Sequence, residues 1–290
     1  MSTARSRRAH ASSLSLVLPA YNEAEGIAQA VREADEALRQ LVRRYEILVV
    51  DDGSRDATAA VVQSLQPRFP RVRLLRHAAN RGYGAALRTG FRAAAFANVA
   101  FTDADCQFDL SDLGYLLPLA GHYPVVVGFR RDRQDPWLRR FYSWGYNVLI
   151  RWLLGTGVRD CDCALKIFRR EALACLLPQS NGFFVNAEMI TRARQLGYAV
   201  AEVGVRHRRR QRGASKVSLA EIPKTLGTLL PFWWSEVVRP RRRPVRPAMA
   251  WNRVAGAEQR ETPGRTLREA AGPGASLRSA PATRGHASGG

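Results

Sequence analysis

The feature that most constrains the fold is an alternation of short apolar runs with helical segments over residues 13–130. The apolar runs are SLSLVLP, YEILVV, VRLLRH, VAF and PVVVGFR. The segment 25–43 has a helical pattern, and 80–95 is a glycine-rich turn that leads into a helix. Unbroken apolar runs are typical of strands that are buried on both faces. This order of elements predicts an α/β fold, with a mostly parallel sheet and helices on both of its faces.

Polar residues gather where three of these predicted strands end. Pro19, Tyr21 and Glu23 follow the first strand, and Asp51 and Asp52 end the second. Asp103, Asp105 and Gln107 follow the fourth strand. Ligands of parallel α/β sheets bind at the carboxyl ends of the strands. We therefore expect these side chains to converge on one edge of the sheet.

The stretch FTDADCQFD, residues 101–109, is the strongest indication of a metal site. Mg²⁺ takes oxygen ligands and is usually held by one or two carboxylates together with substrate phosphates. Asp103, Asp105 and Gln107 supply part of such a shell, and a diphosphate would complete it. The alternative is a solvated acidic turn. Other acidic strand ends on the same edge favour the metal site.

The two other strand ends have alternative interpretations. Asp52 and Gly53 are compatible with a simple turn, whereas a nucleobase or ribose would give the carboxylates a ligand. Asn22 and Glu23 are compatible with helix capping, and Ser54 is a candidate N-cap for the following helix. The sequence NRGYGAALRTG, residues 80–90, does not fit the dinucleotide fingerprint. It indicates a close backbone approach and a helix start, or a plain turn.

The chain carries a formal charge of +20, spread unevenly over its 290 residues. Residues 239–290 hold eleven arginines and three glutamates, a net +8, among many Pro, Gly, Ala and Ser residues. Such a charge suits anionic partners. A nucleic-acid-binding module is one alternative, but the tail has hardly any aromatic residues to stack on bases. We therefore expect no nucleic acid partner, and a disordered tail.

Residues 217–238 have the spacing of an amphipathic helix that Pro223 and Pro231 would kink or break. Its apolar stripe consists of Leu219, Ile222, Leu226, Leu229, Leu230, Trp233 and Val237. Such a helix lies in a membrane interface or packs on the domain's own core. The aromatic helix 136–155 has the same two interpretations. The sequence contains no run of about 18 apolar residues, so no transmembrane helix is predicted. With no secretory signal, we expect peripheral association at the cytoplasmic face of the membrane.

These features divide the chain into four predicted regions. Residues 1–12 would be a disordered basic lead and 13–216 the catalytic domain. Residues 217–238 would be the interfacial helical region, and 239–290 the disordered tail. The oligomeric state is not indicated by any of these patterns.

Seven motifs occur in an order that resembles family 2 glycosyltransferases. They are VLPAYNEAEGI, VVDDGSRDAT, NRGYGAALRTG, FTDADCQFD, GFR, RDCDCALKIFRR and RHRRRQRGASK. The resemblance covers residues 13–235 and is strongest to the dolichol-phosphate mannosyltransferase-like branch, the polyprenyl-phosphate sugar synthases. It implies a GT-A fold and inverting transfer of a sugar from a nucleotide sugar, GDP-mannose or a UDP-hexose, to a polyprenyl phosphate.

The resemblance also implies roles for individual residues. Asp105 and Gln107 would hold Mg²⁺ or Mn²⁺ on the diphosphate, and Arg130 would lie near the transferred or accepted phosphate. Arg210 and Lys216 would contact the diphosphate from a loop that closes over it. The positions that would contact or line the nucleotide site are Pro19, Tyr21, Glu23, Val50, Asp52, Asp103 and Ala104.

An acceptor clamp is indicated by the helix after the fifth strand. Arg139 and Ser143 are four residues apart and therefore share a helix face, where they could hold an acceptor phosphate. Arg140 is the alternative to Arg139. A phosphate monoester is already ionised and attacks without a general base, whereas a hydroxyl acceptor needs one. Asp160 is the candidate base for that alternative, a soluble glycosyltransferase, or it orients a neighbouring Arg or Lys.

Overall fold

The structure is a computed structural model that describes residues 11–131, 137–208 and 221–239. These residues belong to one compact unit. The predicted disordered lead and tail lie almost entirely outside them, so those two predictions stay untested.

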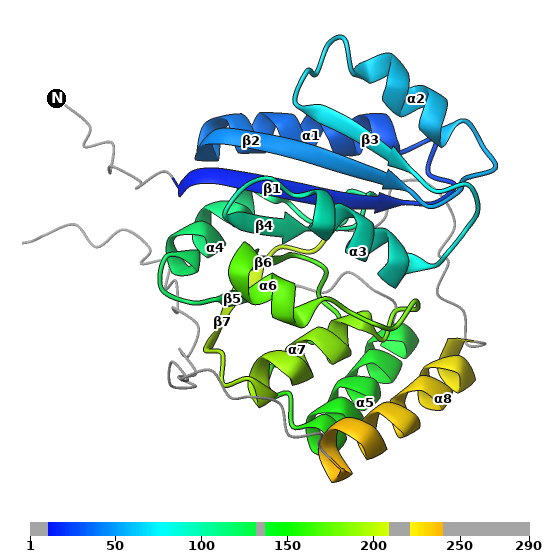
Figure 1. Ribbon diagram of the computed structural model, residues 1–290, viewed down its shortest axis with the longest axis vertical. Coiled ribbons are helices and arrows are strands. Elements are labelled where there is room, and N and C mark those ends of the chain that lie inside the picture. The colour runs from blue at the N-terminus through cyan, green and yellow to red at the C-terminus, as the bar shows by residue number, and fades with distance from the viewer. Residues whose placement is uncertain (1–10, 132–136, 209–220, 240–290) are drawn as a thin grey trace, which may run out of the picture. The chain divides into compact units, whose positions relative to one another are not determined.

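The described residues form a seven-stranded sheet with the spatial order β3-β2-β1-β4-β6-β5-β7 (Figure 1). The strands are β1 (Ala11–Ala20), β2 (Val42–Asp51), β3 (Val72–Arg76), β4 (Asn98–Phe101), β5 (Val125–Arg130), β6 (Lys166–Arg169) and β7 (Val200–Val205). Only β6 runs antiparallel to its neighbours among these strands. The predicted mostly parallel sheet is confirmed.

Helices follow most of the strands. They are α1 (Ile27–Leu41), α2 (Thr58–Leu65), α3 (Tyr83–Ala93), α4 (Leu113–Ala120), α5 (Trp137–Leu154), α6 (Arg170–Leu176), α7 (Val185–Gln195) and α8 (Glu221–Trp233). A short 3₁₀ turn, η1 (Leu110–Asp112), precedes α4, and a π-helical segment, η2 (Trp234–Val238), continues α8.

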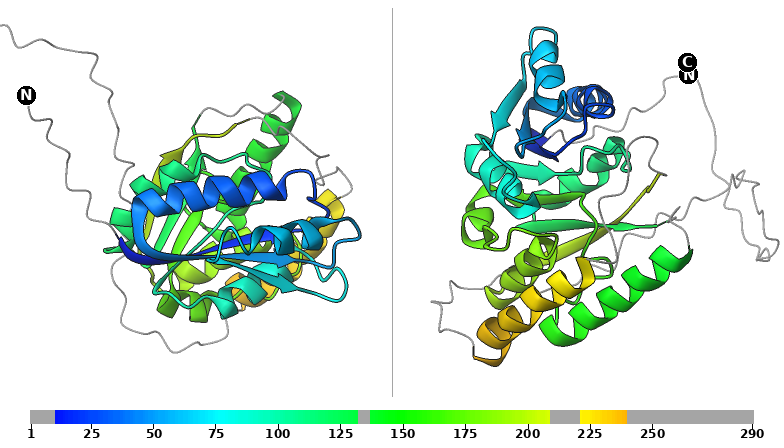
Figure 2. Two further views of the ribbon diagram at one scale, coloured as in Figure 1. Left: turned by 90° about the horizontal axis from the view of Figure 1, so that it is seen from above. Right: turned by 90° about the vertical axis from the view of Figure 1, so that its right-hand side faces the viewer.

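The strand order explains why helices cover both faces of the sheet. From β1 the chain moves outward through β2 to β3, and it then returns to place β4 on the other side of β1. Because crossovers between parallel strands are right-handed, reversing the direction moves the connecting helix to the opposite face. Helices α1 and α3 accordingly lie on opposite faces (Figures 1 and 2). The reversal creates a switch point between β1 and β4, where such sheets bind ligands.

The core is packed most closely where α3 lies on the sheet. Phe91 of α3, Phe101 of β4 and Phe168 of β6 form a ring cluster with centroids 5.7 to 6.3 Å apart. Gly90 permits this approach, since a Cβ there would lie 2.3 Å from Cγ1 of Val17 in β1. Because the cluster fixes α3 against two strands, it helps to position the N-terminus of α3 relative to the carboxyl edge of the sheet.

The antiparallel strand β6 has a consequence for function. Its amino end lies at the same edge as the carboxyl ends of the parallel strands. The segment that precedes β6, which contains Asp160, is therefore brought to the edge where β1, β2, β4 and β5 end. The predicted pattern of strands and helices contained no signal for this reversal.

Element boundaries differ from the predictions in two places. The helix predicted over 25–43 ends at Leu41, and β2 begins at the next residue without a loop. The helix predicted over 217–238 is described from Glu221, and it changes to π-helical geometry at Trp234, three residues after Pro231. Among the residues described, no helix is both long enough and apolar enough to cross a membrane.

Candidate functional site

The loops after β1 and β2 are tied together at the carboxyl edge of the sheet. Asn22 has φ 50°, and its backbone N–H donates to Ser54 Oγ at 2.9 Å, while its Oδ1 accepts from Arg55 N at 2.9 Å. The Glu23 N–H donates to Thr58 Oγ1 at 2.9 Å. Our prediction that Ser54 is the N-cap of α2 is therefore wrong, because α2 begins only at Thr58. The Ser54 hydroxyl instead joins the loop after β2 to the loop after β1.

Asp52 is buried and holds the glycine-rich turn before α3. Its carboxylate lies 2.6 Å from His77 Nδ1 and accepts from the backbone N–H groups of Arg81 at 3.0 Å and Gly82 at 2.8 Å. His77 also lies 2.9 Å from Thr89 Oγ1 through Nε2. The nucleotide contact of Asp52 stays a prediction. The structure adds a second role for it, that of fixing the turn at Gly82, where φ is 94°.

The glycines of the turn approach the chain's own backbone. A Cβ on Gly82 would lie 2.6 Å from Asn181 O, and one on Gly84 would lie 2.1 Å from Ser180 O. Arg88 of α3 donates to the carbonyl groups of residues 178, 179 and 180 at 2.9 to 3.1 Å. The close backbone approach predicted from NRGYGAALRTG is therefore made to the segment between α6 and α7.

Asp103 lies directly after β4 and is held by Tyr83, whose hydroxyl donates to Oδ1 at 2.8 Å. Burial raises the pKa of Asp103, while the Tyr83 hydrogen bond and the charges of Lys166 and Arg130 lower it, and the net change is upward. Burial and the Asp103 carboxylate hold the pKa of Tyr83 well above its usual value, so this phenol acts as a donor. Asp103 is thus positioned by a residue that our sequence analysis did not select.

Lys166, at the start of β6, is a second residue that our sequence analysis did not select. Its Nζ donates to the carbonyl of Cys163 and to Asn186 Oδ1, and it lies 5.3 Å from the centre of the Phe101 ring. A buried ammonium must be paired with acceptors or carboxylates. It supplies positive charge beneath the acidic turn. The signal was available, since Lys166 lies within the motif RDCDCALKIFRR.

Asp105 and Gln107 lie in a tight turn on either side of Cys106, which has φ 58°. Both side chains are half-buried, and the Gln107 N–H donates to Asp105 Oδ1 at 3.1 Å. Within the part of the chain that the structure describes, no cluster of three His, Cys, Asp or Glu side chains could hold a metal ion. A carboxylate and an amide fit a cation such as Mg²⁺ that completes its shell with phosphates and water.

Arg130, at the end of β5, forms a bidentate pair with Asp160. Its Nε and Nη2 lie 2.7 and 2.8 Å from the two carboxylate oxygens of Asp160, and both side chains are largely buried. Burial lowers the pKa of Arg130, but the hydrogen bonds and charge of Asp160 outweigh that effect and raise it. The guanidinium is therefore charged and rigidly oriented.

The remaining predicted site residues differ in how fully the structure describes them. Pro19 and Val50 are register partners in β1 and β2, and Ala104 is buried in the acidic turn. Tyr21 and Glu23 are half-buried in the loop after β1. Arg139 lies in α5, but the structure does not describe its side chain. Arg210 and Lys216 lie outside the described residues.

Ser143, which was expected to share a face with Arg139, has a local partner. Asn147 Nδ2 donates to the carbonyl of Ser143 at 2.8 Å and lies 3.5 Å from its hydroxyl. Asn147 is itself buried and accepts from the backbone N–H of Cys161 at 2.8 Å. The Ser143 position in α5 is therefore linked to the segment that carries Asp160.

These features define an α/β enzyme fold of the GT-A type with an acidic strand-end site. Residues 15–177 match Glycosyl transferase family 2, and the chain belongs to this family.

The chain is 34% identical over 239 residues to "Glycosyltransferase AglD" of Haloferax volcanii, covering 79% of this chain and 38% of that protein. It is also 34% identical over 213 residues to the "Undecaprenyl-phosphate 4-deoxy-4-formamido-L-arabinose transferase" of Sodalis glossinidius, covering 72% of this chain and 64% of that protein. The chain thus spans less than two thirds of either relative.

The fold is similar to that of glucosyl-3-phosphoglycerate synthase from Mycobacterium tuberculosis. The structure of that protein with Mn²⁺ and UDP-glucose superimposes with a TM-score of 0.59 at 22% identity, covering 77% of this chain and 78% of that one. At this identity the likeness shows the fold alone, and it confirms the predicted GT-A fold.

Proposed function

We propose that this protein is a metal-dependent inverting glycosyltransferase that moves a hexose from a nucleotide sugar to a polyprenyl phosphate. The observation that carries the proposal is the location of a buried, charged Arg130 on the same sheet edge as the acidic turn 103–107. The charge of Arg130 acts on Asp103. A cationic clamp beside a cation-binding turn suits a reaction that joins two phosphorylated substrates.

The donor half of the site consists of the loops after β1, β2 and β4. Asp105 and Gln107 would hold Mg²⁺ or Mn²⁺ on the donor diphosphate, where the ion stabilises the negative charge of the leaving group. Residues of all three loops would contact the nucleotide, namely Pro19, Tyr21, Glu23, Val50, Asp52, Asp103 and Ala104. Arg210 and Lys216 would bind the leaving diphosphate from the segment outside the described residues.

The acceptor half requires positive charge more than a base. A phosphate monoester is ionised near neutral pH and attacks the sugar carbon without proton removal. Arg130 and Arg139 would hold that phosphate in line with the bond to be broken. The bidentate pair supports a role for Asp160 in orienting Arg130. Because both Asp160 oxygens accept from the guanidinium, the carboxylate is poorly placed to take a proton from an acceptor hydroxyl, which favours a phosphate acceptor.

A membrane-facing surface accounts for the aromatic residues of α5 and α8. Trp144 and Trp152 of α5 are 60% and 85% exposed, and Leu230 and Trp234 are about half exposed. Helices α5 and α8 lie side by side (Figures 1 and 2). Tryptophan is favoured at membrane interfaces because one end is apolar and the other hydrogen-bonds. This supports peripheral association with a membrane, close to a lipid acceptor, and we place that association at the cytoplasmic face.

Over residues 227–238, whose side chains the structure describes, one face is available for such contact. Leu229 is fully buried, and the ring of Phe232 packs on Phe184 at 5.1 Å. Gln195 Nε2 donates to the carbonyl of Glu236 at 2.6 Å. The described side chains of this region therefore pack on the domain through one face and are exposed on the other, which is compatible with core packing by the first face and the proposed membrane contact by the second.

The proposal is tested by incubating purified protein with Mg²⁺ or Mn²⁺ and a panel of GDP- and UDP-sugars, with and without polyprenyl phosphate. We expect release of a nucleoside diphosphate and a new glycolipid only when the lipid phosphate is present. Transfer to a polyprenol, which has a hydroxyl instead, is the matched control. Efficient transfer to the polyprenol with a base-dependent pH limb would contradict the phosphate-acceptor proposal.

A further inference from the structure

The segment that follows β7 is paired with the acidic turn 103–107, which we call the metal turn because it carries the proposed metal ligands. The backbone N–H of Arg208 donates to the carbonyl of Gln107 at 2.7 Å, and Gln107 Nε2 donates back to the carbonyl of Arg208 at 3.4 Å. Between them Phe108 and His207 form a β-bridge, with ring centroids 5.5 Å apart. Residues 206–208 therefore lie against this turn, which contains the proposed metal ligands Asp105 and Gln107.

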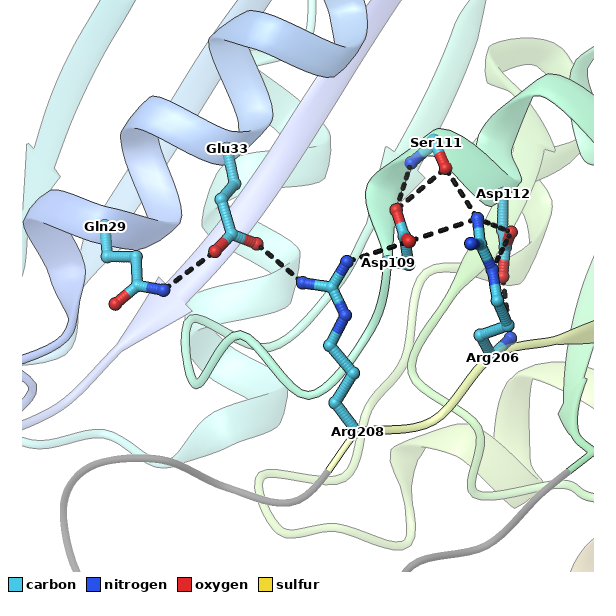
Figure 3. Close-up of polar contacts among 7 residues, drawn as sticks. All are labelled: Gln29, Glu33, Asp109, Ser111, Asp112, Arg206 and Arg208. Carbon is cyan, nitrogen blue, oxygen red and sulfur yellow. Dashed lines mark hydrogen bonds and ion pairs between the residues drawn. The ribbon is translucent and has the colours of Figure 1, made fainter.

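The Arg208 side chain joins this pairing to two other elements (Figure 3). Its Nη2 lies 2.8 Å from Asp109 Oδ2, just before η1, and its Nη1 lies 3.4 Å from Glu33 Oε2 on α1. Glu33 also accepts from Gln29 Nε2 at 2.8 Å. One guanidinium thus bridges the end of the metal turn and the first helix.

Arg206 fixes the same segment from the other side (Figure 3). Its Nε and Nη2 lie 3.0 and 2.7 Å from Asp112 Oδ1, and its backbone N–H donates to Asp112 Oδ2 at 2.6 Å. Nη2 also lies 3.0 Å from Asp109 Oδ2. The two arginines therefore share Asp109, and the direction of the chain through residues 206–208 is set by both.

Asp109 is itself held in place at the start of η1. Its Oδ1 accepts from the Ser111 backbone N–H at 3.1 Å and from the Ser111 hydroxyl at 2.8 Å. Exposed ion pairs contribute little to folding stability. Since Arg208 is partly exposed, its two carboxylate contacts are better explained by positioning than by stability.

We propose that Arg208 is a positioning residue that orients the Gln107 amide for the metal ion. An amide presents nitrogen at one end and oxygen at the other, and a cation binds only the oxygen. The Arg208 carbonyl accepts from the amide nitrogen, which turns the oxygen away from residues 206–208. The side-chain contacts with Asp109 and Glu33 hold that carbonyl in place. This inference rests on the proposed function, in which Gln107 is a metal ligand.

The test measures Mn²⁺ binding directly, by the electron paramagnetic resonance signal of free Mn²⁺ with UDP or GDP present. In Arg208→Ala we expect the dissociation constant for Mn²⁺ to rise about tenfold, the lower end of the effect of outer-shell partners. Arg208→Lys restores one charge contact but not the two-carboxylate fork, so partial recovery is expected. Asp109→Asn should weaken binding in the same direction.

The matched control is Arg39→Ala, which removes another exposed arginine that is paired with a carboxylate, Asp35 of α1. It should leave Mn²⁺ binding unchanged. Circular dichroism and thermal unfolding establish that each variant is folded, and Arg208→Lys serves if the alanine variant is not. Parent-like Mn²⁺ affinity in folded Arg208 variants would overturn the inference alone. Absence of Mn²⁺ binding by the parent would overturn the metal assignment as well.

Discussion

The acidic edge of the sheet buries polar side chains, whereas the aromatic surface of α5 and α8 exposes apolar ones. At the edge, buried carboxylates are held by the chain's own donors, as Asp52 is by His77 and the turn at Gly82. On the surface, Trp144 and Trp152 present large apolar area to the outside. Buried polar groups need partners within the protein, whereas clustered exposed apolar groups indicate a partner beyond it. The edge therefore suits the proposed reaction, and the surface suits the proposed membrane contact.

The two regions should also fail differently when they are altered. Changes at the edge should reduce turnover even with a soluble acceptor, whereas changes on the surface should matter only when a membrane is present. Five predictions test that separation.

The largest effect is expected from Asp105→Asn at the edge. Loss of a carboxylate ligand weakens the cation that neutralises the leaving diphosphate, so kcat/KM should fall about a hundredfold or more. Steady-state release of nucleoside diphosphate at several Mn²⁺ concentrations measures this. Glu171→Gln, an exposed carboxylate at the start of α6, is the control and should be silent. Undiminished activity of Asp105→Asn in chelator would contradict the metal proposal.

The next effect concerns the pair of Arg130 and Asp160. Asp160→Asn keeps the shape but removes the charge that orients Arg130, so kcat/KM for the acceptor should fall about ten- to a hundredfold. If Asp160 orients Arg130 and is not a base, the pH–rate profile should keep its form. Disappearance of an acid limb in the variant would instead identify Asp160 as the general base.

A smaller effect is expected on the aromatic surface. Replacing Trp144, Trp152 and Trp234 by alanine together should weaken binding to anionic vesicles about tenfold, because interfacial apolar area is lost. Activity on a short-chain, water-soluble acceptor should not change. Vesicle sedimentation measures the binding, and an assay with the water-soluble acceptor measures the activity. Tyr115→Ala, which alters an exposed aromatic residue of α4, is the control. Equal vesicle binding by the triple variant and the parent would remove the membrane role of this surface.

Tyr83→Phe should have an effect that depends on pH. The Tyr83 hydrogen bond lowers the pKa of Asp103, so its removal raises that pKa further. A raised carboxyl pKa means protonation at higher pH, so donor binding should weaken severalfold in a mildly acidic buffer and change less in a mildly alkaline one. Titration of nucleoside diphosphate binding at both pH values measures this. Equal loss at both pH values would point to a packing defect instead.

The smallest effect is expected at Cys106, which has a left-handed backbone conformation between the proposed metal ligands. Glycine adopts that conformation at little cost, whereas alanine does not. Cys106→Gly should therefore be more stable than Cys106→Ala by about 1–2 kcal/mol. Urea unfolding of both variants measures the difference. A more stable alanine variant would show that the turn is not strained.

Several residues of the site could be predicted because their signals are local. Asp103 and Asp105 follow an apolar strand directly, and the strand–helix alternation places such ends at one edge. Tyr83 and Lys166 lay within selected motifs, yet nothing in the pattern indicated where their side chains would point. Gln107 was predicted as a ligand, but not that its amide would be held by Arg208, 101 residues later.

The amino-acid sequence by itself determined the α/β class, the acidic strand end and membership of the family, because period, composition and motif order act over short stretches. Only the tertiary structure decided that β6 reverses and sets Asp160 against Arg130, that Asp52 secures a turn 30 residues away, and that Arg208 reaches the acidic turn 103–107. Such contacts depend on how strands pair across the sheet, and pairing is a property of the whole packed core.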